Sequence, residues 1–354
     1  MNTKDTLMWK ELSEGPAAVG RVGRENEAVL ERLAAVGSGI EAVCTVGRGT
    51  SDHAMMYLKY LLEAGPGILT ASAAPSTVTL YGGKPKLQKA LTVGCSQSGE
   101  AADVMEVLRA AKACGGLTAA VTNEPESPMA GMADFALSCC AGKEKSVAAT
   151  KTFLGQLALA RLICAALSGA KEDLTALSGA LTEALPRIEA ATEPMAERFA
   201  GVRECFILSR GISAAVAFEC GLKLQETCYI RARAYHSSDF YHGPMAMVEE
   251  ETPVILFASS RALGGETEAA HRKDLEACAD KMLSLGAELW VITDQPALFA
   301  GKGARTVAVP GGADERDAVF FFALAAQMLA CKVSCRKGLS PDTPRALKKV
   351  TVTR

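Results

Sequence analysis

One stretch decides the fold of this chain: Gly94-Cys95-Ser96-Gln97-Ser98-Gly99-Glu100. The apolar run before it, 90–93, predicts a buried strand, and the apolar periodicity after it, up to residue 113, predicts an amphipathic helix. Its serine hydroxyls can donate hydrogen bonds, and Gly99 permits a tight turn. Because the start of the helix directs N–H groups and a positive dipole end at this loop, the stretch indicates a phosphate-binding site. A serine-rich helix cap without a ligand is the alternative.

A second loop of the same kind follows an earlier strand. Residues 41–46 predict a short apolar strand that ends at Gly47-Arg48-Gly49-Thr50-Ser51, and Asp52 opens a helix. The glycines are similar to a dinucleotide fingerprint, but Asp52 stands where the third glycine belongs, so we exclude a nucleotide cofactor. Thr50 and Ser51 are hydroxyl donors at a helix start. An ordinary N-cap explains one of them but not both.

Strands and helices alternate along the first half. Further strands are predicted at 68–71, 89–95, 117–122 and 135–139, with helices between most of them. This alternation predicts βαβ units and a parallel sheet, on which ligands bind beyond the carboxyl ends of the strands. Both hydroxyl loops directly follow strands, so we expect them at that edge.

The second half repeats the first. Residues 207–213 resemble 45–51, and residues 254–260 resemble 91–97. We therefore predict a duplicated α/β unit, in which the first copy binds phosphate and the second supplies chemistry. The predicted organisation is an N-terminal helical segment, a first domain, a helical connector, a second domain and a tail that folds over the active site, at 1–40, 41–170, 171–200, 201–338 and 339–354.

Composition narrows the class of protein. A chain of 354 residues that is 49% hydrophobic can form two domains with sizeable cores, and a net charge of −2 argues against nucleic acid as a partner. The 12 cysteines include no C-x-x-C pair, which favours free thiols in a reducing cytoplasm. No set of histidines, cysteines and carboxylates has metal-binding spacing, so we expect no metal.

Two observations argue against a membrane or secretory role. The N-terminus lacks the apolar core of a signal peptide. The longest nearly apolar run, 318–331, is too short to span a bilayer and predicts a buried helix. We therefore expect a cytoplasmic protein.

A helix in the second half carries the first candidate for chemistry. Glu219, Lys223 and Glu226 follow one another at spacings of four and three, which places them on one helix face. A solvated face with an ordinary ion pair is the alternative. If the helix borders the ligand, Lys223 can stabilise an oxyanion and Glu226 can act as a general base.

The chain has only four histidines, and His242 precedes a Gly-Pro turn, which makes it a candidate for acid–base chemistry. His53 and His236 remain possible. The tail contains two prolines and cannot extend the preceding helix. Its pattern predicts that it is tied down, which would bring Lys348 or Lys349 near the body of the protein.

Together these motifs resemble the double sugar-isomerase (SIS) domain family, as found in the isomerase half of glucosamine-6-phosphate synthase. The resemblance covers nearly the whole chain in order, through residues 47–54, 96–100, 147–151, 222–226, 241–244 and 344–352. It implies two tandem SIS-type three-layer αβα subdomains with parallel sheets. Among standalone members the chain is most similar to the SIS-type glucosamine-6-phosphate deaminases, through residues 47–54, 73–76, 143–145 and 347–351.

The resemblance also implies roles for individual residues. Glu226 would move a proton between sugar C1 and C2, Lys223 would steady the enediolate, and Lys349 would meet the open-chain carbonyl. His242 would open the ring, reaching across from the partner subunit of a homodimer. The implied phosphate contacts are Ser51, Ser96, Gln97 and Ser98, with Thr50 beside them, and the positions lining the sugar are Glu144 and Val147.

Two departures from the family pattern are Ala101 and Ala149, where hydroxyl residues are common. They leave the phosphate donors in place but affect the preferred sugar. No glutaminase segment precedes the motifs and no cysteine follows Met1, so we expect no glutamine hydrolysis.

The leading hypothesis is an amino-sugar phosphate deaminase/isomerase that converts glucosamine 6-phosphate to fructose 6-phosphate and ammonia without a cofactor. The alternatives are a fructosamine 6-phosphate deglycase or other phosphosugar isomerase, and a non-catalytic sensor of sugar phosphates. A sensor needs the serine loops but not Glu226, His242 and Lys349 together.

Overall fold

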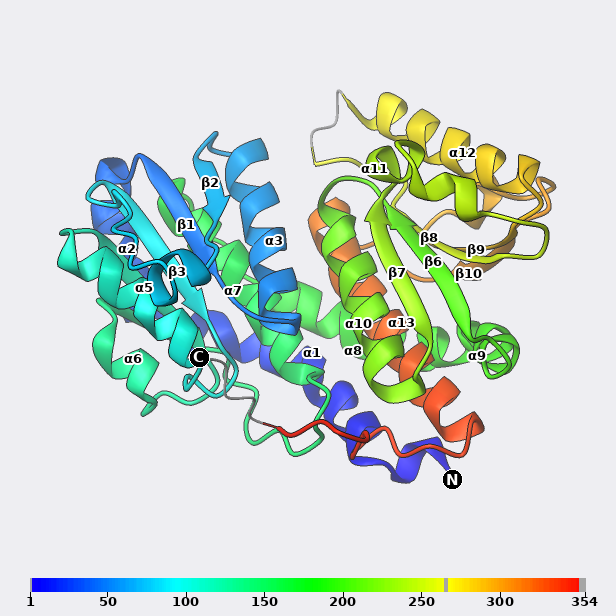
Figure 1. Ribbon diagram of the computed structural model, residues 1–354, viewed down its shortest axis with the longest axis horizontal. Helices are drawn as coiled ribbons and strands as arrows, with labels where there is room; N and C mark the ends of the chain where they lie inside the picture. Colours follow the sequence, from blue (N-terminus) through cyan, green and yellow to red (C-terminus); the bar gives the residue numbers. More distant parts are fainter. Residues whose placement is uncertain (1, 264–266, 350–354) are drawn as a thin grey trace. The chain divides into compact units, whose positions relative to one another are not determined.

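The computed structural model describes residues 2–263 and 267–349 and shows two compact units (Figure 1). The first, which we call the N-unit, comprises Glu14–Glu144, Ala149–Gly179 and the tail from Lys348. The second, the C-unit, comprises Lys145–Ala148, Ala180–Leu347 and the N-terminal residues up to Ser13. The last part of the predicted tail, 350–354, lies outside the described residues.

The N-unit is built on a five-stranded parallel sheet with strand order β2-β1-β3-β4-β5. Its strands are β1 (Ala42–Val46), β2 (Leu69–Ser72), β3 (Ala90–Cys95), β4 (Leu117–Thr122) and β5 (Phe135–Ser138). Its helices are α2 (Glu27–Val36), α3 (Thr50–Ala64), α4 (Ser76–Thr79), α5 (Ala102–Ala113), α6 (Pro128–Met132) and α7 (Lys151–Leu167), with the 3-10 turn η2 (Gly37–Gly39). Because β1 and β3 are neighbours, with Val46 opposite Gly94, the two hydroxyl loops leave the sheet side by side at its carboxyl edge.

The C-unit repeats this plan with strand order β10-β9-β8-β6-β7, again parallel throughout. Its strands are β6 (Glu204–Ser209), β7 (Arg231–His236), β8 (Pro253–Ala258), β9 (Glu288–Thr293) and β10 (Arg305–Ala308). Its helices are α9 (Glu193–Phe199), α10 (Ala214–Cys228), α11 (Ser237–Tyr241), α12 (Glu268–Ser284) and α13 (Glu315–Arg336), with η1 (Thr3–Asp5), η3 (Gly211–Ser213), η4 (Pro244–Met247) and η6 (Pro296–Leu298). Helices α1 (Leu7–Glu25) and α8 (Thr175–Ala191) each belong partly to both units.

Each unit has a central helix that is almost wholly buried. In the N-unit, α7 packs against α3, and in the C-unit, α13 packs against α10. Helix α13 is longer than the predicted run 318–331, and by length and composition alone it could cross a membrane. Its apolar window is entirely buried inside the protein, as the sequence predicted, which identifies it as a core helix.

The predicted α/β fold with parallel sheets is confirmed. The predicted strands agree with the observed ones to within a few residues, and the twelve cysteines are free thiols that are buried or half-buried. Strand β7 was not predicted, because it lies at the sheet edge and alternates arginines with alanines instead of forming an apolar run. Helix α3 begins at Thr50 and not at Asp52, so both hydroxyl residues belong to its first turn.

Candidate functional site

The loop between β3 and α5, residues 96–101, is held in a defined shape by its own backbone. The Ser96 N–H donates to the Val121 carbonyl at 3.0 Å, and the Gly99 N–H donates to the Ser96 carbonyl at 3.1 Å. Gly99 has a φ of +65°, and a Cβ there would lie 2.0 Å from the hydroxyl oxygen of Ser127. Only glycine fits this turn, as the sequence predicted.

The start of α5 is partly capped from within, because the Asp103 carboxylate accepts the Val104 N–H at 2.9 Å. Its N-cap residue, Ala101, makes no capping hydrogen bond through its side chain. Ser98 is half-buried, and its hydroxyl accepts from the Glu100 N–H at 3.3 Å. The N–H groups of the first turn of a helix need partners that the helix cannot supply, and an anion satisfies them. Phosphate binding at this loop stays a prediction.

The neighbouring loop at the start of α3 adds buried hydroxyls. Thr50 and Ser51 are 9% and 6% exposed, and the side-chain amide of Gln156 on α7 donates to the Ser51 hydroxyl at 3.0 Å. Gln156 is not among the residues predicted from the sequence. Its signal was a single amide within the apolar run of the helix, where a polar side chain needs a partner.

A cation also lies at this edge of the sheet, which the sequence analysis overlooked. The guanidinium of Arg48 reaches from the first loop to Asp103 on α5, with Nε and Nη2 at 2.7 and 2.6 Å from the same carboxylate oxygen. Asp103 is 3% exposed, so this ion pair ties the two hydroxyl loops together. The Arg48 side chain is still 53% exposed.

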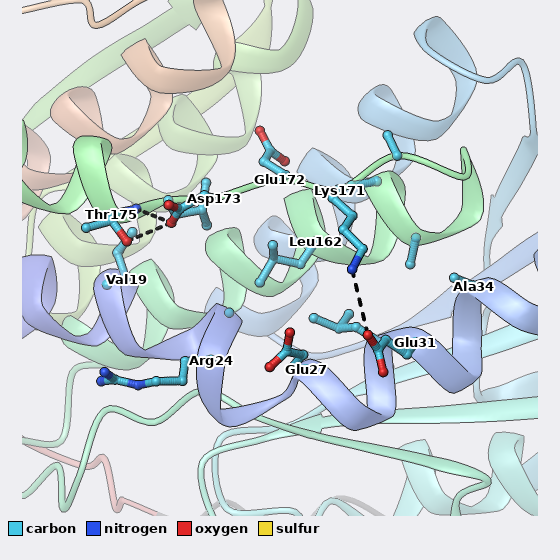
Figure 2. A pocket seen from close by; sticks show the side chains of 17 residues that line it. Val19, Arg24, Glu27, Glu31, Ala34, Leu162, Lys171, Glu172, Asp173 and Thr175 are labelled. Atoms are coloured by element: carbon cyan, nitrogen blue, oxygen red, sulfur yellow. Dashed lines mark hydrogen bonds and ion pairs between the residues drawn. The ribbon is translucent and has the colours of Figure 1, made fainter.

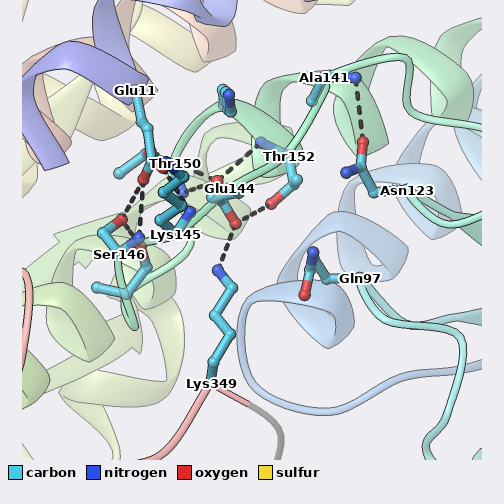
Figure 3. A network of polar contacts seen from close by, with 12 residues as sticks. Glu11, Gln97, Asn123, Ala141, Glu144, Lys145, Ser146, Thr150, Thr152 and Lys349 are labelled. Atoms are coloured by element: carbon cyan, nitrogen blue, oxygen red, sulfur yellow. Dashed lines mark hydrogen bonds and ion pairs between the residues drawn. The ribbon is translucent and has the colours of Figure 1, made fainter. Parts of the chain in front are cut away.

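Asn123, at the end of β4, joins the serine loop to the segment that leads to Glu144. Its N–H donates to the Gln97 carbonyl at 3.0 Å. Its side chain accepts from the Ala141 N–H at 3.0 Å and donates to the Gly142 carbonyl at 2.8 Å. Figure 3 shows Asn123 with Ala141 and Gln97 beside it. Gln97, Glu144 and Lys349 thus belong to one loop cluster.

Glu144 has a structural role that the sequence did not predict. One oxygen of its buried carboxylate accepts the N–H groups of Thr150 and Thr152, at 2.9 and 3.2 Å, and so caps α7. The other accepts the Thr152 hydroxyl and the Lys349 ammonium, each at 2.8 Å (Figure 3). The predicted attachment of the tail is thereby confirmed, and a contact of Glu144 with a sugar stays a prediction.

Val147 lies in a short segment of the C-unit that the tail also anchors. The Val147 N–H donates to the Asp342 carbonyl at 3.0 Å, while the Asp342 carboxylate accepts the N–H groups of Leu7 and Met8 at the start of α1. The tail therefore anchors the backbone of the half-buried Val147.

In the C-unit, α10 carries a lysine between two carboxylates. The Lys223 side chain is completely buried, with its ammonium 2.6 Å from a Glu226 oxygen and 3.4 Å from a Glu219 oxygen. Glu219 is also buried, whereas the Glu226 side chain is 24% exposed. The predicted placement on one helix face is confirmed. The solvated-face alternative is wrong, because the lysine is buried.

His242 follows α11 directly, and its side chain is exposed on a turn. Its backbone N–H donates to the Asp239 carbonyl at 3.1 Å, and Gly243 behind it has a φ of +156°. An exposed imidazole on a fixed turn can act on a substrate held by another chain. His236 is instead half-buried, 5.5 Å from the Phe218 ring, and burial lowers its pKa.

In the C-unit, the loop after β6 corresponds to the hydroxyl loop after β1, and a side chain of the protein contacts it. Glu315, the first residue of α13, is 3% exposed, and one of its carboxylate oxygens accepts the Ser213 hydroxyl at 3.3 Å. The same oxygen lies 3.8 Å from His271 Nε2. Burial raises the pKa of Glu315 to about 8. Because a carboxyl group occupies the loops of β6, they are less suited to phosphate than those of the N-unit.

A hollow elsewhere in the N-unit contains none of the predicted site residues. Its volume is about 370 Å³, and it is lined by α1, α2, α7 and the segment before α8 (Figure 2). Lys171 lies 3.8 Å from Glu31 across it. Among the described residues, no three histidines, cysteines or carboxylates are grouped so that they could hold a metal ion.

Comparison with known proteins gives the family. The SIS domain family matches residues 41–166 and 199–335. The glutamine–fructose-6-phosphate aminotransferase (isomerizing) of Pseudomonas putida is 34% identical over 98% of this chain, which spans 59% of that protein's length.

Two solved structures have the same fold. A candidate phosphosugar isomerase from Silicibacter pomeroyi has a TM-score of 0.80 and 33% identity, covering 95% of this chain and 100% of that one. The glucosamine-6-phosphate deaminase of Thermotoga maritima has a TM-score of 0.69 over 96% of this chain and 100% of that one, but at 22% identity it shows the fold alone. Through the two matched segments, the resemblance predicted from the motifs is confirmed, and this chain belongs to the SIS domain family.

Proposed function

We propose that this protein is an amino-sugar phosphate deaminase/isomerase, which converts glucosamine 6-phosphate and water to fructose 6-phosphate and ammonia. The observation that carries the proposal is the Lys223–Glu226 pair, in which a buried ammonium lies 2.6 Å from a partly exposed carboxylate. A buried ion pair is a poor source of stability, so its presence on α10 favours a chemical role. The serine loop supports the phosphate half of the proposal.

Each residue of the predicted site is assigned one task in the reaction. Ser96, Ser98 and the first turn of α5 bind the phosphate. Glu226 takes the proton from one sugar carbon and returns it to the neighbouring carbon, while the Lys223 ammonium stabilises the enediolate-type oxyanion. This proton shift from C2 to C1 converts the open-chain amino aldehyde to an imine at C2. Water adds to C2, the carbon–nitrogen bond breaks and ammonia leaves, so that the water oxygen becomes the ketone oxygen. No cofactor enters these steps.

The tail lysine and the exposed histidine complete the proposal. We propose that Lys349 meets the open-chain carbonyl. Its ammonium lies 2.8 Å from the buried Glu144 carboxylate, and this order supports the assignment. His242 opens the sugar ring, and we propose that it does so in the partner subunit of a homodimer. Its exposed imidazole supports this assignment.

Two other functions would use some of the same groups. A deglycase acting on a fructosamine 6-phosphate needs the same base and differs in the amine that leaves. A sugar-phosphate sensor needs only the serine loop. The buried Lys223–Glu226 pair favours an enzyme over a sensor, because binding a phosphate does not require it.

The decisive assay incubates the full chain with glucosamine 6-phosphate, with fructosamine 6-phosphates that carry amino acids, and with fructose 6-phosphate alone. Ammonia, free amine and hexose phosphate are measured together. We expect ammonia and fructose 6-phosphate from the first substrate. Release of an amino acid from the second with no ammonia from the first would identify a deglycase. Tight binding of all three without any turnover would identify a sensor.

A parallel reaction with fructose 6-phosphate and glutamine tests the activity named for the aminotransferase relatives. We expect neither glutamate nor glucosamine 6-phosphate in that reaction. Their formation would contradict the proposed deaminase.

A further inference from the structure

Three arginines line an open hollow on the C-unit, at the end of the helix that carries Lys223 and Glu226. The hollow has a volume of about 490 Å³ and lies where α10 ends and the edge strand β7 begins. No aspartate or glutamate lines it within the described part of the chain. Its lining consists of Gln225, Tyr229, Ile230, Arg231, Ala232, Arg233 and Arg345.

Arg345 is fixed before any ligand arrives. Its backbone N–H donates to the Tyr229 hydroxyl at 2.8 Å, and its guanidinium lies 4.2 Å from the centre of the Tyr229 ring. Tyr229 ends α10 with a φ of +56°, a strained value for a tyrosine. A guanidinium that is already ordered loses less conformational freedom on binding.

Arg231 and Arg233 are two residues apart on β7, so their side chains leave the same face of the strand. Both are exposed. The Nη2 of Arg233 lies 3.5 Å from a Glu204 oxygen, with both side chains more than 40% exposed, and such a surface pair is weak. The lining of the hollow is therefore strongly positive in a chain whose net charge is −2.

The edge strand itself is not available for a peptide. The Ala232 N–H donates to the Ile230 carbonyl at 2.8 Å, and the Ala232 carbonyl accepts the side-chain amide of Gln225. An added β-strand would need both of these groups. A small anion needs only the guanidinium groups, which bind phosphate oxygens in pairs.

We propose that this hollow binds a small phosphate-bearing anion through Arg231, Arg233 and Arg345. The site touches two segments with proposed roles, because Tyr229 ends the helix of Lys223 and Glu226, and Arg345 precedes Lys349 by four residues. A bound anion would therefore alter turnover. That consequence rests on the proposed function, whereas the binding itself does not.

Isothermal titration with inorganic pyrophosphate tests the site on the full chain. Four proteins are compared: the wild type, R231Q/R233Q, the serine-loop variant S96A/S98A, and the control R187Q/K281Q, which removes two exposed positive charges elsewhere on the C-unit. We expect R231Q/R233Q to bind pyrophosphate in this hollow at least about tenfold more weakly than the wild type does. S96A/S98A and the control should retain it. Circular dichroism verifies folding, and R231K/R233K should recover part of the affinity.

Two outcomes would overturn the inference. The first is an absence of pyrophosphate binding to the wild type. The second is a loss of all binding in S96A/S98A while R231Q/R233Q binds as the wild type does, which would place the anion in the serine loop and leave the proposed function intact. Loss of binding in R231Q/R233Q together with a failed deaminase assay would support the site and refute the proposed function.

Discussion

The environment of Lys223 is hard to explain unless this residue takes part in the reaction. A completely buried ammonium is tolerated only with partners, and Glu219 and Glu226 supply them at 3.4 and 2.6 Å. Removing one partner leaves a charge without compensation in the core, which commonly costs about 3–5 kcal/mol. A substitution at Glu226 that keeps its shape and hydrogen-bonding ability is therefore the cleanest test.

We expect Glu226→Gln to keep phosphosugar binding and to lower kcat by about 10²–10⁴-fold, the usual contribution of a general base. The amide retains an oxygen that can accept from Lys223, so the protein should stay folded. Steady-state kinetics with glucosamine 6-phosphate, together with titration of fructose 6-phosphate, measure both effects. Glu197→Gln, on the exposed face of α9, is the matched control. Unchanged turnover would exclude Glu226 as the base.

At the phosphate end, Ser98→Ala should mainly raise KM, by about 10–100-fold. A phosphate contact is made equally in the ground state and the transition state, so its loss weakens binding and leaves kcat nearly unchanged. The measurement is the same kinetic assay. A fall in kcat at constant KM would contradict the assignment of Ser98 to the phosphate.

At the scale of elements, α13 explains why the two copies of the loop pattern differ. Its first residue, Glu315, places a carboxyl group against Ser213 at the end of β6, while the N-cap Asp314 accepts the N–H groups of Arg316 and Asp317. The duplicated motif is thus preserved in both units. They differ in what faces the loop, because in the C-unit a buried carboxyl group contacts Ser213.

The buried carboxyl of Glu315 predicts a pH dependence of folding. In the folded protein the pKa of Glu315 is raised to about 8, above its value in the unfolded chain. Between these two pKa values the folded protein holds a proton that the unfolded chain has lost, so a rise in pH toward 8 destabilises the folded state. The free energy of unfolding should therefore fall by up to about 1.4 kcal/mol per pH unit from this group. We expect Glu315→Gln to remove that slope.

Urea unfolding of wild type and Glu315→Gln between pH 6.5 and 8 measures this difference. The pKa of His271 is lowered by burial in the folded protein, and this residue is present in both proteins, so the difference between their slopes reports on Glu315. Asp314, which also faces Glu315, is common to both proteins. Equal slopes for the two proteins would show that Glu315 is ionised throughout.

At the scale of the whole molecule, the proposed homodimer can be tested by mixing inactive chains. If His242 acts in the partner's site, Glu226→Gln and His242→Ala chains refolded together form mixed dimers with one complete site each. Random pairing should restore about a quarter of the wild-type activity. Each variant alone should stay inactive. If the mixture shows no recovery while co-purification of differently tagged chains confirms mixed dimers, His242 acts within its own chain.

The sequence predicted features that depend on local pattern. The strand–loop–helix units, the requirement for glycine at position 99 and the common face of Lys223 and Glu226 all follow from periodicity or spacing within a few residues. Strand β7 escaped prediction because an edge strand covered on one side lacks the apolar run of a central strand.

Taken by itself, the sequence determined the order of the elements, the duplicated α/β plan and the chemistry available at the strand ends, because backbone propensity and apolar periodicity are local. Only the tertiary structure decided which charges meet. Lys349 reaches a carboxylate 205 residues away in the chain, and Arg48 reaches one 55 residues away. Such pairs depend on how strands are ordered in a sheet and where a tail returns, and no local pattern specifies either of these.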